Sequence, residues 1–383
     1  MRVGVKGDVC YNKADKKENG KRSETQMRVL IATGGTGGHI YPALALADAM
    51  KEKDPKTEIL FVGTANRMEA TEIPKAGYRF EAIKAKGLNG SALAKVQAIV
   101  QLVHAYFACR KIVRQFRPDY AIGFGNYISA PVILAAHFAH VPTMLHEQNS
   151  YAGKANRFLA QYADKIVGCY PENLQQFPAS KTRILGNPRA SVAAQAQRDP
   201  QVVRQLGLDP TKPLIVVVMG SLGSESVNAV MVKALKSMAG KAYQVLYVTG
   251  RAAYQQVQSQ GLECANIKVV EYIDGVRVMV NADLAVVRGG ATTAAEITVL
   301  GLPAIIIPSP YVPNNHQVLN AKALQEAGAA LMIEEKDLTD AEITAKIEGV
   351  IFDPIRLEGM RAAAKRLGHP DANEQIYNWI QQG

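Results

Sequence analysis

Short apolar runs alternate with helical patterns along almost the whole chain, and this alternation restricts the fold more than any other feature of the sequence. Nearly continuous hydrophobic strands separated by helices are typical of a parallel sheet covered on both faces. In the first half we expect strands at 28–33, 58–63, 79–83, 119–123, 142–146, 165–168 and 183–185. The intervening helices are expected at 41–53, 67–76, 92–117, 130–140, 153–162 and 171–177. The sequence therefore predicts an α/β chain.

The alternation stops once and then starts again. Gly186-Asn187-Pro188 ends the first series, and a polar stretch follows to about residue 207. Further strands are expected at 214–218, 243–248, 267–271, 283–287, 303–307 and 329–333, and the last 45 residues have a helical pattern. Because 383 residues are enough for two separate cores, we expect two doubly wound parallel-sheet domains that face a shared cleft.

The same pattern places the domain boundaries. Residues 1–26 are polar and lysine-rich, without the apolar core of a signal peptide, and we expect a disordered extension there. We assign 27–188 to an N-terminal domain and 189–365 to a C-terminal domain. The remaining 366–383 are expected to form a helix that packs back toward the N-terminal domain.

The cysteine pattern and the hydropathy indicate in which cellular compartment the chain folds. The cysteines form no C-x-x-C pair, which argues against a disulfide framework or a zinc site and fits a reducing cytosol. They are widely separated, at Cys10, Cys109, Cys169 and Cys264. The segment most similar to a membrane span is 127–145, but Pro131 and Pro142 interrupt it. We therefore expect a helix followed by a buried strand in that segment.

Positive charge is concentrated in one segment of the chain. The formal net charge is +10, and 75–117 holds nine Lys or Arg residues against the single acid Glu81. The helix expected at 92–117 carries an apolar stripe with basic residues toward its C-terminal end. The stripe either faces the core beside a solvated basic face or meets an anionic surface. No nucleic-acid-binding motif is present, so a membrane is the better candidate for that surface.

The loop Gly34-Gly35-Thr36-Gly37-Gly38-His39 follows the first strand and precedes a helix. It is neither the dinucleotide fingerprint, which would need glycine at Ile40, nor a Walker A loop. Unpaired N–H groups at the helix N-terminus suit a phosphate or a polyhydroxylated group. His39 is either a polar residue of the first helical turn or a general base. We favour the base, because a helix N-terminus keeps imidazole neutral.

Two further loops follow buried strands in the second half. Residues 219–224 offer glycines and hydroxyls that either cradle a diphosphate or cap a helix through Ser221 or Ser224. In 288–296, Thr293 and Glu296 have capping-box spacing, and this structural reading is favoured when the segment is taken alone. The alternative is that the Glu296 carboxylate accepts hydrogen bonds from vicinal ribose hydroxyls.

The strand expected at 142–146 ends in the polar residues His146-Glu147-Gln148-Asn149. We favour a site in a cleft over a capped loop, because four polar groups at a strand end are costly unless they are satisfied or exposed. The chain has no D-x-D motif and no histidine cluster, so we expect no metal and no cofactor. Helix N-termini and Arg189 would then neutralise a bound diphosphate.

Five motifs together resemble the bacterial GT-B glycosyltransferases of family 28 that make lipid II from lipid I. They are GGTGGH with Tyr41-Pro-Ala-Leu-Ala, His146 to Asn149, Gly186-Asn-Pro, Gly290-Ala-Thr-Thr-Ala-Ala-Glu296, and Asn314-Asn-His-Gln317 through Asn320-Ala321. The resemblance covers 27 to about 380 and leaves 1–26 outside. The chain departs from the family pattern at two places. Its second glycine-rich loop is Met219-Gly-Ser-Leu-Gly-Ser, where the family usually has Gly-Gly-Ser-x-Gly-Ala, and Arg189 directly follows Pro188, where some family members insert a residue.

The resemblance implies a reaction and its substrates. The family transfers GlcNAc from UDP-GlcNAc, with inversion and without a metal, to the C4 hydroxyl of MurNAc in undecaprenyl-diphosphoryl-MurNAc-pentapeptide (lipid I). The N-terminal domain would face this acceptor and the membrane, and the C-terminal domain would bind UDP-GlcNAc. The enzyme would be peripheral, on the cytoplasmic side of the cell membrane, with 75–117 on the anionic surface. Other cell-wall synthesis and division proteins are candidate partners, and nucleic acid is not.

The resemblance also implies roles for individual residues. His39 would be the base, and Thr36, Gly37 and Gly38 would line the cleft beside the sugar. The donor contacts would come from Asn149 and Gln317 (sugar), Arg189 and Ser221 (diphosphate), Ile273 (uracil, through its backbone), Ala291, Thr292, Thr293, Ala294 and Ala295 (diphosphate and ribose) and Glu296 (ribose hydroxyls). Two alternatives remain open, a GT-B-like UDP-GlcNAc 2-epimerase and a non-catalytic UDP-sugar sensor or scaffold.

Overall fold

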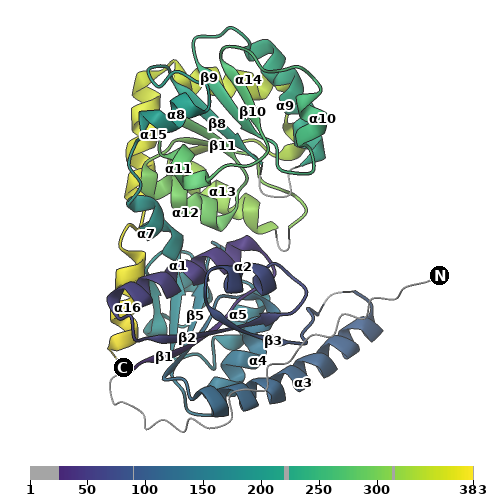
Figure 1. Ribbon diagram of the computed structural model, residues 1–383, viewed down its shortest axis with the longest axis vertical. Coiled ribbons are helices and arrows are strands. Elements are labelled where there is room, and N and C mark those ends of the chain that lie inside the picture. Colours follow the sequence, from purple (N-terminus) through teal and green to yellow (C-terminus); the bar gives the residue numbers. More distant parts are fainter. Residues whose placement is uncertain (1–25, 89, 220–223, 313–314, 383) are drawn as a thin grey trace, which may run out of the picture.

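The computed structural model describes residues 26–88, 90–219, 224–312 and 315–382. These residues form two α/β domains, one above the other in Figure 1, each with a parallel sheet between layers of helices. The predicted fold class, two doubly wound domains, is confirmed. Ser221 and Asn314 lie outside the described residues.

The N-terminal domain is built on a seven-stranded parallel sheet in the order β3-β2-β1-β4-β5-β6-β7. Its strands are β1 (Arg28–Ala32), β2 (Glu58–Thr64), β3 (Arg79–Ile83), β4 (Tyr120–Gly123), β5 (Thr143–Glu147), β6 (Lys165–Gly168) and β7 (Thr182–Ile184). Its helices are α1 (Gly37–Lys53), α2 (Glu69–Lys75), α3 (Ala92–Phe116), α4 (Asn126–His137), α5 (Lys154–Leu159) and α6 (Asn173–Gln176). The strand order reverses between β1 and β4, where ligand crevices of such sheets open.

The C-terminal domain repeats the plan with six parallel strands in the order β10-β9-β8-β11-β12-β13. They are β8 (Leu214–Val218), β9 (Gln244–Val248), β10 (Ile267–Val270), β11 (Leu284–Val287), β12 (Ala304–Ile306) and β13 (Ala330–Met332). The helices are α8 (Pro200–Gln205), α9 (Glu225–Met238), α10 (Tyr254–Gln258), α11 (Gly275–Met279), α12 (Ala291–Leu300), α13 (His316–Glu326), α14 (Asp340–Ile351) and α15 (Pro354–Leu367). Here the order reverses between β8 and β11.

Two helices connect the domains, on the left of Figure 1. Helix α7 (Pro188–Ala194) packs against α12 of the C-terminal domain and α1 of the N-terminal domain. Helix α16 (Ala372–Gln381) returns from the C-terminal domain to lie beside α1 (Figure 1). Its Ile376, Trp379 and Ile380 are buried in the core of the N-terminal domain. The Arg183 guanidinium also covers the Trp379 ring, 4.6 Å from its centroid.

One predicted helix boundary is wrong, and one of the two alternatives for the apolar stripe of α3 is excluded. Helix α1 begins at Gly37 and not at Tyr41, so the second half of the glycine-rich loop is its first turn. The apolar stripe of α3 does not face the core, because the buried side chains of this helix are Ala98, Ala105, Cys109, Val113 and Phe116. Leu93, Val96 and Val100 are exposed instead.

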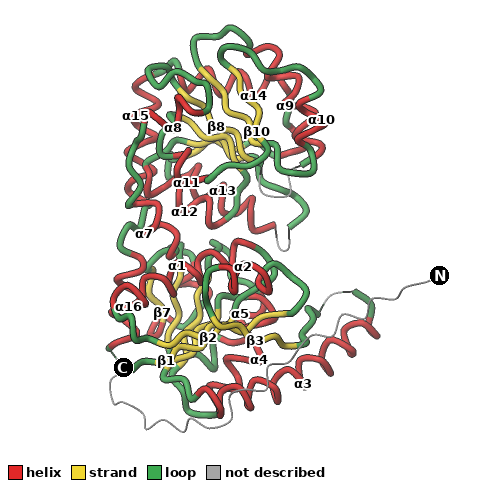
Figure 2. Tube along the Cα trace, in the orientation of Figure 1, coloured by secondary structure: helices red, strands yellow, loops and turns green. Residues whose placement is uncertain are grey.

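Helix α3 is also the one helix among the described residues that is long and apolar enough to cross a membrane. The segment 127–145, which the sequence singled out, is divided between α4 and β5. In the most apolar stretch of α3 only 17% of the residues are buried. However, α3 connects β3 to β4 of the same sheet, so both of its ends lie at one domain. Figure 2 accordingly shows it along the edge of the N-terminal domain.

We predict that Trp379→Ala lowers the free energy of unfolding by about 3–5 kcal/mol, because it leaves a cavity where α16 joins the N-terminal core. Urea denaturation followed by circular dichroism measures this. Ile355→Ala, at a side chain that is 87% exposed, is the control and should change stability by less than about 0.5 kcal/mol. Equal effects of the two substitutions would show that α16 does not hold the N-terminal domain.

Candidate active site

A cavity of about 1840 Å³ lies between the domains, at the carboxyl ends of both sheets. It brings together eleven of the residues that the sequence singled out: Thr36, Gly37, Gly38, His39, Asn149, Arg189, Ala291, Thr292, Thr293, Glu296 and Gln317. Ile273, Ala294 and Ala295 do not line it. Ala294 is buried in the core of the C-terminal domain, and at Ile273 the neighbouring Tyr272 and Asp274 line the cavity in its place.

His39 lies in the first turn of α1 and lines this cavity on the side of the N-terminal domain. Its Nδ1 is 3.3 Å from Oγ1 of Thr36, the N-cap residue of the helix. The other edge of the ring faces Gly125, where a Cβ atom would lie 3.3 Å from Cδ2 of His39. Burial lowers the pKa of His39 to about 4, His316 lowers it further, and Glu69 opposes this shift. The imidazole is therefore neutral at physiological pH and has a free lone pair.

A buried carboxylate holds the glycine-rich loop in place through a hydrogen bond. Glu69 of α2 accepts hydrogen bonds from the Gly35 N–H (2.9 Å) and from the N–H (3.0 Å) and hydroxyl of Thr64. At Gly34, where φ is +155°, a Cβ atom would lie 2.5 Å from the Glu69 carboxyl group. Only glycine permits this approach. Glu69 could not be predicted from the sequence, because nothing in the local pattern marks it as buried.

The four polar residues at the end of β5, 146–149, divide into two groups: the first two are the last residues of the strand and the other two follow it. His146 is buried, with Nε2 3.1 Å from the Gly186 carbonyl oxygen and its ring stacked on Phe124, and burial lowers its pKa to about 4. Glu147 is buried as well and accepts hydrogen bonds from the backbone N–H groups of Asn149 and Gly153. Gln148 and Asn149 line the cavity. The first two residues therefore shape the loop, and the last two are positioned to contact a ligand.

Asn320 of α13 connects this loop to the opposite domain. Its side chain is fully buried. Oδ1 accepts hydrogen bonds from the N–H and hydroxyl of Ser150, at 2.9 and 3.0 Å. Nδ2 donates to the carbonyl oxygen of Gly289 (3.0 Å) and to Oδ1 of Asn149 (3.3 Å). One amide thus links the loop after β5 to the loop after β11, and both loops carry cavity residues.

Helix α12 presents its N-terminus to the cavity. The helix begins at Ala291 with Gly290 as N-cap, so Thr293 is inside the helix and the predicted capping box is wrong. The first N–H groups of an α-helix have no intrahelical acceptor, which makes this end an anion site. Thr292 adds a buried hydroxyl oxygen with no hydrogen bond from any described residue.

Glu296 pairs with Arg189 on the wall of the cavity. Nε and Nη2 of Arg189 donate to Oε1 of Glu296 at 2.9 and 2.7 Å. Burial raises the pKa of the Glu296 carboxyl, and the guanidinium opposes this shift. Oε2 has no hydrogen bond from the part of the chain that the structure describes. The pair therefore offers a cation toward an anionic ligand and one carboxylate oxygen toward hydroxyl donors.

Several other cavity residues were missed by the sequence analysis. Tyr41 and His316 lie inside quoted motifs without an assigned role, and Tyr272, Arg288 and Tyr127 also line the cavity. Within the described residues, no group of three His, Cys, Asp or Glu side chains is arranged to hold a metal ion. The groups that suit an anion here are the α12 N-terminus and Arg189.

Two doubly wound parallel-sheet domains that face one cavity form the GT-B fold. The comparisons identify the family: residues 29–167 match the glycosyltransferase family 28 N-terminal domain, and residues 214–376 match its C-terminal domain. The chain belongs to glycosyltransferase family 28.

Relatives and solved structures agree with this membership. The chain is 40% identical, over 93% of its length and 99% of the relative, to the UDP-N-acetylglucosamine--N-acetylmuramyl-(pentapeptide) pyrophosphoryl-undecaprenol N-acetylglucosamine transferase of Lactiplantibacillus plantarum. A Bacillus cereus transferase of the same name is also 40% identical, over 92% of this chain and 98% of the relative. The crystal structure of Acinetobacter baumannii MurG matches with a TM-score of 0.74, at 26% identity, over 93% of this chain and 100% of that chain.

We predict that Asn320→Ala lowers kcat about 10- to 100-fold and changes the Kd for UDP-GlcNAc by less than threefold. Removing the amide leaves buried groups of both domains unpaired, at roughly 1–3 kcal/mol each, and releases the two loops from one another. Steady-state kinetics and calorimetric titration of UDP-GlcNAc separate the two effects.

Asn373→Ala is the matched control. The Asn373 side chain donates to the Ala45 carbonyl at 3.3 Å, so it also connects α16 to the N-terminal domain, but it does not line the cavity. Its substitution should leave kcat within about twofold. An unchanged kcat in Asn320→Ala, or equal losses in both variants, would contradict the role given to Asn320.

Proposed function

We propose that the chain transfers GlcNAc from UDP-GlcNAc to lipid I and so forms lipid II. The protein is a UDP-GlcNAc-dependent N-acetylglucosaminyltransferase, and its near full-length likeness to transferases with this name supports both substrates. The observation that carries the mechanism is that one cavity holds His39 on its N-terminal wall and the α12 N-terminus with the Arg189–Glu296 pair on its C-terminal wall.

The C-terminal wall suits the donor. The N–H groups at the start of α12 and the Arg189 guanidinium would face the diphosphate of UDP, without a metal ion. Oε2 of Glu296 would accept hydrogen bonds from the ribose hydroxyls. Gln317 and Asn149 would contact the sugar, because they line the cavity from opposite domains. The backbone contact of Ile273 with uracil remains a prediction, as do the roles of Ala294, Ala295 and Ser221.

The N-terminal wall suits the acceptor hydroxyl. The neutral His39 accepts the proton of the MurNAc C4 hydroxyl, the C4 oxygen attacks C1 of GlcNAc, and the bond from C1 to the diphosphate oxygen breaks in the same displacement. UDP leaves with the electron pair, and the developing phosphate charge is stabilised by helix N-termini. A single displacement inverts the configuration at C1. Thr36 Oγ1 orients the imidazole through its contact with Nδ1.

Fold likeness does not favour an epimerase. The UDP-GlcNAc 2-epimerase of Neisseria meningitidis matches with a TM-score of 0.66 but at 13% identity, over 93% of this chain and 100% of that chain. A likeness at this identity shows the shared GT-B fold alone.

The protein is expected at the cytoplasmic face of the cell membrane as a peripheral enzyme. Lipid-linked acceptors of this class lie in a membrane, and α3 exposes Leu93, Val96 and Val100 next to exposed lysines such as Lys95. Apolar residues beside cations suit an anionic lipid surface. Binding of other cell-wall synthesis or division proteins remains a prediction.

We predict that transfer of labelled GlcNAc to a lipid I analogue in detergent is unaffected by EDTA and falls about 10²–10⁴-fold in His39→Ala, because a general base is lost. His104→Ala, at an exposed histidine outside the cavity, is the control and should keep full activity. Binding of UDP-GlcNAc without formation of a disaccharide lipid would refute the transferase.

We also predict the pH dependence of the reaction. Because the pKa of His39 lies at about 4 and not at 6.5, the ring stays neutral and able to accept a proton down to about pH 5. The loss of kcat/KM caused by protonation of His39 should therefore be centred near pH 4. A pH profile of the wild type beside that of His39→Gln checks this. A midpoint near 6.5 that disappears in the variant would contradict the buried environment assigned to His39.

A further inference from the structure

The active-site cavity continues into the N-terminal domain as an apolar groove between α3 and α4, which we call the α3–α4 groove. One wall is formed by Ile99, Leu102, Val103, Tyr106 and Phe107 of α3. The other wall is formed by Ala130, Pro131 and Leu134 of α4, with Phe138 just beyond its end and Phe158 of α5. These residues line the same cavity as His39 and Glu296, so the groove and the reaction centre are continuous.

The spacing of these residues shows that the groove is a regular feature of the two helices. On α3 the lining positions are three or four residues apart, as are Tyr127, Ala130, Pro131 and Leu134 on α4, so each set forms one helical face. The walls are apolar yet open: Ile99 is 51%, Phe107 58% and Phe138 59% exposed. A continuous apolar surface of this kind is unfavourable in water and marks a binding site.

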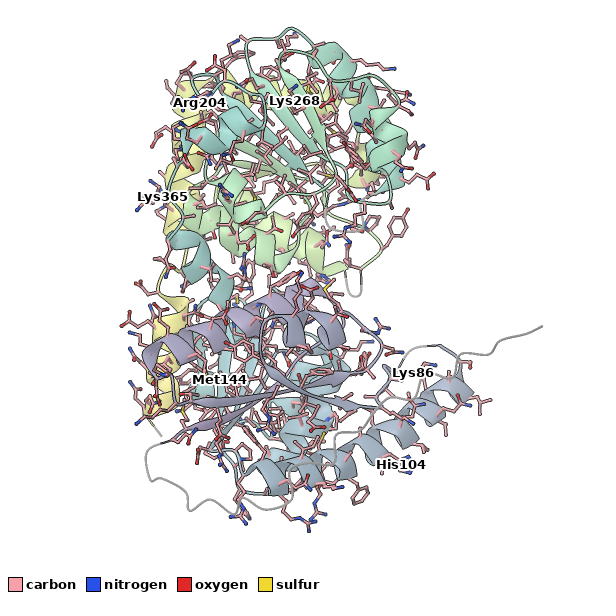
Figure 3. All side chains as sticks on the ribbon, in the orientation of Figure 1. Lys86, His104, Met144, Arg204, Lys268 and Lys365 are labelled. Carbon is pink, nitrogen blue, oxygen red and sulfur yellow. The ribbon has the colours of Figure 1, made fainter. Side chains whose placement is uncertain are left out.

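The groove is separate from the outer surface of α3. Leu93, Val96, Val100 and His104 are exposed at helical spacing but do not line the cavity. Figure 3 shows His104 at the outer, lower edge of the N-terminal domain. Contact of this outer surface with a membrane would leave the groove unfilled, so the groove needs an occupant of its own.

The position of the groove identifies that occupant. It starts at Asn126 and Tyr127, where α4 begins, next to Gly125 and the ring of His39. Asn126 also donates a hydrogen bond to the Gly34 carbonyl, which joins this end of α4 to the catalytic loop. From there the groove follows α4 to Phe138, eleven residues or about 16 Å at 1.5 Å per residue.

Aromatic rings line the far end of the groove. The ring of Phe138 lies 6.4 Å from that of Tyr106 and 6.2 Å from that of Tyr162, which in turn is 5.7 Å from Phe158. Nearer the cleft, Lys154 lines the cavity one helical turn before Phe158 and offers a cation on this side. The order of groups along the cavity is a proton acceptor, a cation and then an apolar channel that opens at the domain edge.

We propose that the α3–α4 groove binds the first isoprene units of the acceptor's polyprenyl chain. This inference rests on the proposed function. C4 of MurNAc and the C1 carbon that carries the diphosphate lie on opposite sides of the sugar ring, so the lipid points away from His39. The chain then runs along α4 and leaves the protein beside α3, where the outer surface of that helix meets the membrane.

Soluble acceptors of different chain length test the proposal without a membrane. Lipid I analogues with geranyl, farnesyl and geranylgeranyl chains are compared below their critical micelle concentrations, in the absence of detergent and vesicles. We expect KM to fall about tenfold with each added isoprene unit, which corresponds to burial of roughly two methylene groups, while kcat stays the same.

Val103→Gln and Leu134→Gln alter the two walls independently. Each should abolish the dependence of KM on chain length. Val96→Gln and Val100→Gln, on the outer surface of α3, are the matched controls. They should keep the chain-length dependence and weaken sedimentation with anionic phospholipid vesicles.

The outcomes separate the inference from the proposed function. Transfer to all three acceptors with the same KM in the wild type would overturn the groove and leave the transferase intact. A chain-length dependence that persists in both groove variants would overturn the groove as well. Failure to use any acceptor would refute the transferase, and the inference with it.

Discussion

The active site depends on the four hydrogen bonds of one buried amide. Neither domain holds a complete site, because the neutral histidine is on one and the anion-binding helix terminus is on the other. Asn320 joins the two domains beside these halves, through Ser150 and Asn149 of the loop after β5 on one side and Gly289 of the loop after β11 on the other. A buried amide is costly unless its donors and acceptors are all satisfied, so this bridge forms only when the two loops are correctly placed.

Two buried carboxylates shape loops of the N-terminal domain at this site. Glu69 supports the glycine-rich loop below His39, and Glu147 gathers the N–H groups of the loop that carries Asn149. Glu296 differs from these two, because it is paired with Arg189 at the cavity surface and keeps one oxygen toward the ligand space. The groups that face the ligand space are thus the neutral His39 and the Arg189–Glu296 pair. The buried carboxylates of Glu69 and Glu147 hold the backbone of the loops in place.

The sequence predicted the sheets better than the site. Buried parallel strands are continuous apolar runs, so the ends of β1 and β8 were predicted to within one residue. The start of α1 at Gly37 was not predicted, because glycine is typical of loops and not of a first helical turn. For the stripe on α3 the sequence leaves both the core and an anionic surface open, because periodicity does not show which face of a helix is covered. Asn320 and Ser150 are 170 residues apart, and Glu69 lies in an ordinary helix. Such contacts come from tertiary packing, which no local pattern encodes.

The stereochemistry of the product tests the central claim most directly. The proposed reaction is a single displacement, with His39 and the leaving diphosphate on opposite walls of one cavity. The sugar of UDP-GlcNAc is α-linked, so the product made from a soluble lipid I analogue should contain only β-linked GlcNAc on C4 of MurNAc. Proton and carbon NMR of the purified disaccharide lipid measure both the linkage and its position. An α-linkage, or attachment at another hydroxyl, would contradict the account.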